Sequence, residues 1–219
     1  MPSNNIKNSL SVARIGAYEV FVGGAPGLAQ TEKALNLYMW NAQVSSAFLV
    51  PLHVCEVVIR NAIADVLETV YGPRWPWSVG FERSLPIPLH GYKPKDDLVN
   101  ARRNQPTTGK VIPELKFVFW QKMLTSRFDN RLWNNHIATV FPNSVGLGLR
   151  SNQLRQKLYD DLEIIRKLRN RIAHHEPVIS RNLLSDFTTV KQLISFRCEF
   201  TTEWMQNNQI LLPLLTLKP

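Results

Sequence analysis

Apolar residues recur along most of the chain at intervals of three and four, which is the period of an α-helix and not that of a β-strand. The pattern is clearest after residue 150, where the intervals between apolar positions are four, four, three, three and four. We expect this stretch to form a strongly amphipathic helix that continues to Pro177, because a proline disfavours helix at the residue before it. Its core positions are Leu154, Leu158, Leu162, Ile165, Leu168 and Ile172.

A second long helical pattern begins near Thr31 and continues to Gly72 and Pro73. Thr31 is expected to cap the start of this helix, and the Gly-Pro pair is expected to stop it. Pro51 removes one backbone donor, so it is predicted to kink or divide the segment. The apolar face consists of Leu35, Tyr38, Ala42, Leu49, Leu52, Ile59, Ile63, Val66 and Val70.

The remaining patterns complete an all-α helical bundle in a single domain over residues 1–219. Residues 73–112 are rich in Pro and Gly and predict a loop-rich irregular insertion with one short helix near 96–103. Helices are expected at 114–126, at 127–141 and at about 183–205, followed by a short apolar tail. The expected core positions of the middle region are Phe117, Trp120, Leu124, Phe128, Trp133 and Phe141.

Charge and cysteine content do not alter the predicted fold, but they indicate which partners and which cellular compartment to expect. The 219 residues carry 26 Lys and Arg against 17 Asp and Glu, a formal charge of +9, which favours nucleic acid first and anionic membrane surfaces second. Cys55 and Cys198 lie in apolar stretches, as free buried thiols do. Residues 1–17 lack the apolar core of a signal peptide, and the apolar stretch 44–59 contains polar residues and a proline. We expect a cytoplasmic protein without a membrane span.

Candidate chemistry is concentrated at residues 166–177. A histidine titrates near neutral pH, so His174 can exchange the protons of a reacting RNA 2′-OH and 5′-oxygen. The guanidinium of Arg169 can hold a phosphate and its developing charge. Asn170 could bond the phosphate or orient the imidazole, and His175 could be a second acid–base group or a structural neighbour. The competing interpretation is a His-His pair that interacts with the helix dipole.

The spacing of this segment limits how it could work. Arg169 and His174 are about 140° apart around an ideal helix, so a bend or a second copy of the chain is needed to bring them to one phosphate. Arg166, Lys167 and Arg171 could bind RNA, although such a cluster is also typical of a solvated face. The adjacent histidines project in different directions and have no further ligand cluster, so we predict neither a metal nor another cofactor.

A charged pair in the first long helix is the other candidate. Glu56 and Arg60 lie four residues apart inside an apolar run, which places them on one helical face and suggests partial burial. With Asn61 they could line the active-site cleft and orient Arg169 or His174. Equally, they could form a structural ion pair that locks two helices together.

The segment Arg169-Asn170-Arg171-Ile172-Ala173-His174 resembles the Arg-Asn-x-x-x-His signature of the HEPN superfamily (higher eukaryotes and prokaryotes nucleotide-binding). The His-His-Glu-Pro continuation is similar to the Abi-like, abortive-infection branch of that superfamily. Residues 37–48, 56–63 and 117–142 resemble the N-terminal and middle regions of Abi-like proteins, so that the resemblance extends over about residues 8–195.

This resemblance implies a dimeric helical bundle whose two Arg-x4-His motifs face each other. It also implies a metal-independent endoribonuclease that acts as a toxin or anti-phage effector, with an antitoxin or regulatory partner possible. Arg169 and His174 then take the catalytic positions, and Asn170 takes the polar position beside the arginine. Two alternatives stay open, a non-catalytic RNA- or nucleotide-binding module and an interaction protein that works through its dimer surface.

Overall fold

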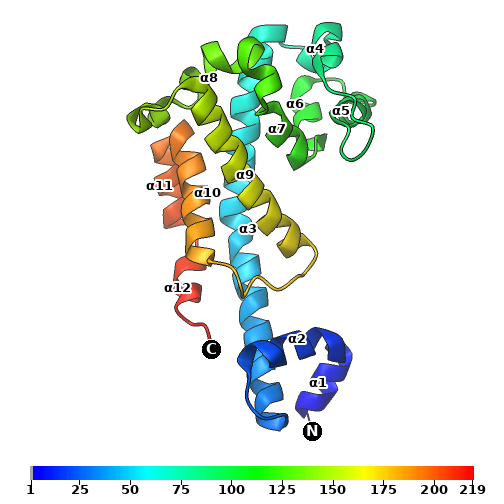
Figure 1. The fold of residues 1–219 in the computed structure, drawn as a ribbon, viewed down its shortest axis with the longest axis vertical. Helices are drawn as coiled ribbons and strands as arrows, with labels where there is room; N and C mark the ends of the chain where they lie inside the picture. Colours follow the sequence, from blue (N-terminus) through cyan, green and yellow to red (C-terminus); the bar gives the residue numbers. More distant parts are fainter. Residues whose placement is uncertain (1) are drawn as a thin grey trace.

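The computed structural model describes residues 2–219, and every regular element in that range is helical. The fold is all-α, as predicted. Its axis is α3 (Leu28–Tyr71), a 44-residue helix that extends through most of the molecule (Figure 1). By length and composition α3 could also cross a membrane, as the core helices of many soluble proteins could; 44% of its most apolar window is buried inside the molecule.

The two ends of α3 and its proline are only partly as predicted. The helix ends at Tyr71, and Gly72 caps it at φ +84° with its N–H donating to the Glu68 carbonyl oxygen at 2.8 Å, which confirms the predicted stop. The predicted start at Thr31 is wrong, because the helix begins one turn earlier at Leu28. Pro51 is buried inside an unbroken helix, so the predicted division is also wrong. Packing of the surrounding core outweighs the loss of one backbone hydrogen bond.

Two short helices, α1 (Pro2–Leu10) and α2 (Val12–Val22), cover the N-terminal end of α3. One carboxylate joins all three elements. Glu19 Oε1 accepts from Lys7 Nζ and from the Thr31 hydroxyl, at 2.7 Å in both cases. These contacts lower the pKa of Glu19. Thr31 therefore holds α2 against α3 instead of capping a helix.

The helix with the clearest periodicity, α9 (Ser151–Ala173), crosses α3 obliquely (Figure 1). All six predicted core positions of α9 are buried. The single helix predicted over 183–205 is instead two, α10 (Leu183–Arg197) and α11 (Glu199–Asn207), because the backbone is extended at Cys198.

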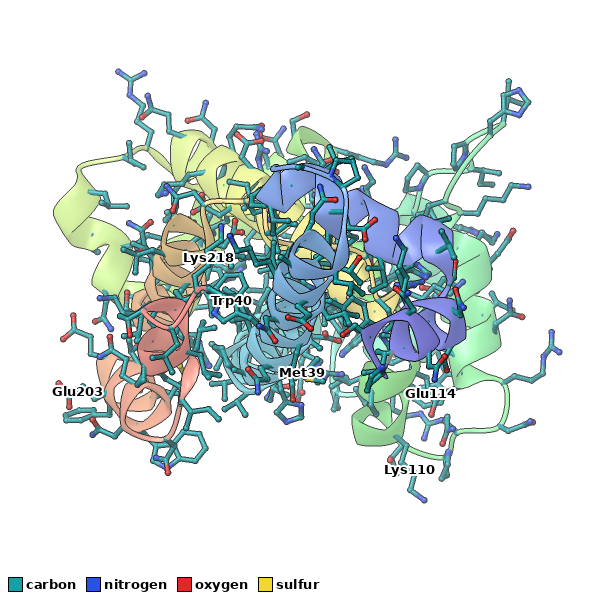
Figure 2. The ribbon with its side chains drawn as sticks, turned by 90° about the horizontal axis from the view of Figure 1, so that it is seen from below. Met39, Trp40, Lys110, Glu114, Glu203 and Lys218 are labelled. Carbon is teal, nitrogen blue, oxygen red and sulfur yellow. The ribbon has the colours of Figure 1, made fainter. Side chains whose placement is uncertain are left out.

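The C-terminal segment returns to α3 through α12 (Leu211–Leu215). Trp40 Nε1 donates to the Leu214 carbonyl oxygen at 2.8 Å. The ammonium of Lys218 lies 5.4 Å from the centre of the Trp40 ring, and Figure 2 shows these two side chains near each other.

Residues 73–112 contain more helix than their composition predicts. They form α4 (Val79–Ser84), α5 (Pro94–Arg102) and α6 (Thr108–Val111), with a 3-10 turn η1 (Trp75–Trp77) and the start of another, η2 (Ile112–Glu114). The elements are too short to show a period, but η1, α4, α5 and α6 each bury an apolar side chain in the core, namely Trp75, Phe81, Leu98 and Val111.

The middle region connects this part to α9. It contains α7 (Phe117–Met123), a 3-10 turn η3 (Ser126–Phe128), a π-helical turn η4 (Asp129–Trp133), α8 (Asn134–Val140) and a 3-10 segment η5 (Pro142–Leu147). All six core positions predicted here are buried, which confirms the hydrophobic pattern even though the helices are shorter than expected.

Candidate functional site

The site begins at the C-terminus of α9, which ends at Ala173 and not at Pro177 as predicted. The amide of Glu176 donates to the Arg171 carbonyl oxygen at 2.8 Å, and the amide of His175 donates to the Ile172 carbonyl oxygen at 3.0 Å. This pair of bonds is a Schellman motif, which requires a left-handed residue after the helix. That residue is His175, at φ +54°.

Three polar contacts hold the turn after α9 in place. Arg14 Nη1 from α2 donates to the His175 carbonyl oxygen at 2.7 Å. Arg171 Nη2 donates to the Pro177 carbonyl oxygen at 2.7 Å. The Val178 amide donates to Oδ1 of Asn41 in α3 at 2.8 Å, and both groups are buried. The turn formed by residues 174–178 is thus fixed to two other helices.

A pocket of about 400 Å³ lies between α3 and this turn. One wall is a single face of α3, and the other is the last turn of α9 together with His175. The lining is largely apolar with a few hydroxyl, amide and imidazole groups, and consists of Tyr38, Asn41, Ala42, Ser45, Ser46, Leu49, Ile172, Ala173 and His175.

Arg169 lies on the side of α9 that faces this pocket. At about 100° per residue it is about 40° from Ala173 and about 60° from Ile172, and both of these residues line the pocket. It also lies about 20° from the fully buried Leu162, two turns earlier. Yet Arg169 is exposed, and within residues 2–219 it has no hydrogen-bond or ion-pair partner. An unpaired guanidinium therefore stands one turn from the pocket.

The two histidines differ in position. His175 lines the pocket, because its left-handed backbone turns the chain back toward α3. Both residues are exposed, but His174 is not part of the pocket lining and keeps a near-helical backbone at φ −94° and ψ 10°. It therefore stays about 140° around the helix from Arg169. Within one chain the pocket lining therefore includes His175 and not His174.

The other polar residues of the segment have partners or point elsewhere. Arg166 forms two bonds with Glu163, at 2.8 and 2.9 Å. Lys167 lies 3.6 Å from the same carboxylate. The guanidinium of Arg171 is used in the turn. Asn170 is half-buried and does not line the pocket; around α9 it is about 60° from Ala173 and about 160° from Ile172. Of the arginines and lysine predicted to bind RNA, none is free of a partner.

Glu56 and Arg60 lie on the pocket-facing side of α3. Both are about 20° from Leu49 around the helix, and Glu56 is about 10 Å further along its axis. Their ion pair is long, at 3.8 Å, and both side chains are half-buried. Asn61 is exposed and about 120° from Leu49, so the structure separates it from this face. The pair therefore lies on the helical face that lines the pocket, beyond its lining residues, whereas Asn61 does not.

Two tyrosines close the pocket at the end near α2. Tyr38 lines it, and the buried Tyr18 packs against Tyr38 edge to face, with ring centres 5.3 Å apart. Burial, together with Tyr38, raises the pKa of Tyr18 to about 12. The Tyr18 hydroxyl has no hydrogen-bond partner within the described residues. The pocket is therefore lined at this end by the ring of Tyr38, with the buried Tyr18 packed behind it.

Sequence reasoning missed Arg14, Asn41 and Tyr38 as parts of this site. Asn41 carries a signal, because it is a polar residue at a position where the helical pattern of α3 requires burial. Arg14 carries none, because its contact with His175 joins residues 161 positions apart.

The chain has no match among protein-family models, curated proteins or solved structures. Within residues 2–219 no three His, Cys, Asp or Glu side chains group closely enough to hold a metal ion.

Proposed function

We propose that this protein is a metal-independent endoribonuclease of the HEPN type, acting as an abortive-infection or toxin-type effector. The observation that carries the proposal is the unpaired Arg169 beside a pocket whose lining includes a histidine fixed by the turn after α9. A guanidinium without an acidic partner keeps its donors available for a phosphate.

The chemistry needs only groups that this site contains. A neutral imidazole removes the proton of the RNA 2′-OH while the oxygen attacks the neighbouring phosphorus. Arg169 stabilises the charge that develops on the phosphate oxygens. The bond from phosphorus to the 5′-oxygen then breaks, and that oxygen takes a proton. The products are a 2′,3′-cyclic phosphate and a 5′-OH end, and DNA is not cut because it lacks the 2′-OH.

Our proposal differs from the sequence motif in the histidine that takes this role within a single chain. The sequence motif assigns proton transfer to His174, which lies on another side of α9 from Arg169. His175 lines the pocket, and Arg169 is one turn of α9 before Ala173, which also lines it. In our proposal His175 acts with Arg169 of its own chain, and His174 acts only if a second copy brings it to the phosphate. Whether His174 or His175 transfers the proton therefore depends on whether two copies of the chain dimerise through this motif.

The test uses total RNA in excess EDTA, with analysis of the product ends. Four proteins are compared, namely wild type, Arg169→Ala, His174→Asn and His175→Asn. Asn is chosen at both positions because it tolerates the left-handed backbone of residue 175. We expect Arg169→Ala to lose activity at least 100-fold. A similar loss in His175→Asn with a small loss in His174→Asn supports the single-chain site.

The reverse order of the two histidine variants would support the motif assignment, with a site shared between two copies. Cleavage that depends on added metal, or equal cleavage of DNA, contradicts the mechanism. If wild type binds RNA without cutting it and Arg169→Ala binds more weakly, the chain is a non-catalytic RNA-binding module. That alternative is favoured by the presence of a single imidazole in the pocket lining, because the cleavage reaction uses both a base and an acid.

A further inference from the structure

A second hollow lies at the other end of α3, far from the turn after α9. It has a volume of about 480 Å³ and is lined by Gly80, Arg83, Ser84, Arg127, Asn130 and Arg131. We call these six residues the arginine pocket. The ring of Tyr71, the last residue of α3, lies near Gly80. Because α3 rises about 1.5 Å per residue, Tyr71 is about 30 Å from Leu49 in the pocket described above.

The three arginines of this pocket lack acidic neighbours. Within residues 2–219, Arg83 and Arg131 have neither a hydrogen bond nor an ion pair, and the described contact of Arg127 is to the Ser84 carbonyl oxygen at 2.8 Å. The nearest acids along the chain are already used. Glu82 pairs with Arg102 at 2.6 Å and with Lys95 at 3.1 Å. Asp129 pairs with Arg155 at 2.6 Å.

The other polar groups of the pocket add donors. Asn134 Nδ2 donates to Asn130 Oδ1 at 3.0 Å, which occupies the amide oxygen and leaves the Asn130 N–H groups available. The Ser84 hydroxyl donates to the Phe81 carbonyl oxygen at 2.7 Å. The pocket thus contains three guanidinium groups and the N–H groups of one amide as donors. Its acceptor oxygens, those of the Ser84 carbonyl and the Asn130 amide, already accept hydrogen bonds from the protein.

All three arginines are exposed, so water and salt weaken their mutual repulsion, and a bound anion would neutralise what remains. The guanidinium fork matches the oxygens of a phosphate, and the six lining residues include no aromatic ring on which a base could stack. We propose that the arginine pocket binds phosphate groups and recognises their charge and not a base.

Local backbone structure supports a built site. Arg131 lies within the π-helical turn η4, Arg127 lies in η3 directly before it, and Arg83 is on α4. The segment before η4 is held to α4 by the bond from Arg127 to Ser84. A π-helical turn is rare and occurs frequently at functional sites. Here it brings two arginines four residues apart toward a third from α4.

The phosphate could belong to a free phosphorylated small molecule or to the backbone of a single-stranded RNA. The probes are inorganic phosphate, ATP and a single-stranded RNA oligomer, with affinities measured by calorimetry and by fluorescence anisotropy at several salt concentrations. The test variant is Arg83→Gln with Arg131→Gln. The matched control is Arg103→Gln with Lys110→Gln, which removes the same charge from exposed positions; Figure 2 shows Lys110 at the edge of the molecule.

We expect the test variant to lose at least 10-fold in affinity and the control to stay within about 2-fold of wild type. Binding of phosphate or ATP identifies a small-molecule site. Binding of RNA alone identifies a backbone contact, and the slope of log affinity against log salt should then decrease by about 1.4 for the two arginines removed. Running every protein in an Arg169→Ala background separates this result from the proposed ribonuclease site.

Two results would overturn the proposal. One is that wild type binds none of the probes at low salt, and the other is that the test variant binds them as well as wild type does. Thermal unfolding of each variant shows whether a loss of affinity is caused by misfolding. Because Arg83 and Arg131 have no partners, their removal should leave the melting temperature unchanged or higher. If it falls, Arg83→Lys with Arg131→Lys keeps the charge and should recover RNA affinity.

Discussion

His175 has a backbone conformation that a side chain makes unfavourable. Its φ of +54° is left-handed, and a residue other than Gly pays about 1 kcal/mol for that conformation. Glycine would complete the Schellman motif without this cost. The imidazole at this position lines the pocket. We infer that the His175 side chain has a role beyond ending the helix.

Replacing His175 with Gly therefore separates stability from activity. We expect the free energy of unfolding to rise by about 1 kcal/mol, measured by urea denaturation, while RNA cleavage is lost. His174→Gly is the control. Because φ at His174 is negative, glycine gains nothing there, and the variant should be unchanged or less stable by about 0.5–1 kcal/mol. A destabilised His175→Gly would contradict the strain argument.

At the scale of elements, the site depends on the contact between α3 and the turn after α9. The contact between Asn41 and the Val178 amide is buried and joins residues 137 positions apart. A buried amide that loses its partner costs about 1–3 kcal/mol. The side chain of Asn41 also lines the pocket, so one residue both holds the turn and shapes the wall.

We expect Asn41→Ala to lower the free energy of unfolding by about 1–3 kcal/mol. Amide exchange should speed up at residues 174–178 more than in the rest of α9, because the turn loses its attachment to α3. Asn36→Ala is the matched control on the same helix, since Asn36 is exposed and without a described partner. Its effect should stay within about 0.5 kcal/mol. Equal effects of the two substitutions would mean that the Val178 contact adds no stability.

At the scale of the whole molecule, carboxylates join helices and carry the acid sensitivity of the fold. Glu163 on α9 accepts from Arg166 and from the buried Gln121 of α7. The Arg166 contact, followed by that of Gln121, lowers the pKa of Glu163 from 4.5 to about 2 against the opposing effect of burial. A lowered pKa gives stability that is present above the unfolded value of 4.5 and is lost as the pH falls toward 2.

Glu163→Gln should therefore be less stable than wild type at pH 7, by about 1–2 kcal/mol after allowance for partial exposure. The difference should shrink as the pH falls from 4.5 toward 2, because wild-type Glu163 then takes up its proton. Urea denaturation across that range measures it. Glu114→Gln, at an exposed position without a described partner, should show no such pH-dependent difference. A constant difference at every pH would rule out the carboxylate as its source.

The pattern of apolar residues was sufficient for the all-α class, for the core faces of α9 and the middle region, and for the stop at Gly72. These features depend on spacing within one segment, and burial of an apolar face is the dominant favourable term in folding. The same pattern failed at Thr31 and Pro51, where contacts with α2 and with the core outweigh local preference. It also failed in residues 73–112, where the helices are too short to show a period.

The sequence alone identified Arg169 and the histidine pair as candidates, because the ability of arginine to bind phosphate and of histidine to transfer protons does not depend on the fold. Only the tertiary structure decided that His175, and neither Arg169 nor His174, lines the pocket. The left-handed turn at His175, the contact from Arg14 and the wall of α3 join residues that are distant in the chain, and no spacing rule connects them. The arginine pocket is similar: Arg83, Arg127 and Arg131 are unremarkable in sequence and become a site only when α4 packs beside the π-helical turn.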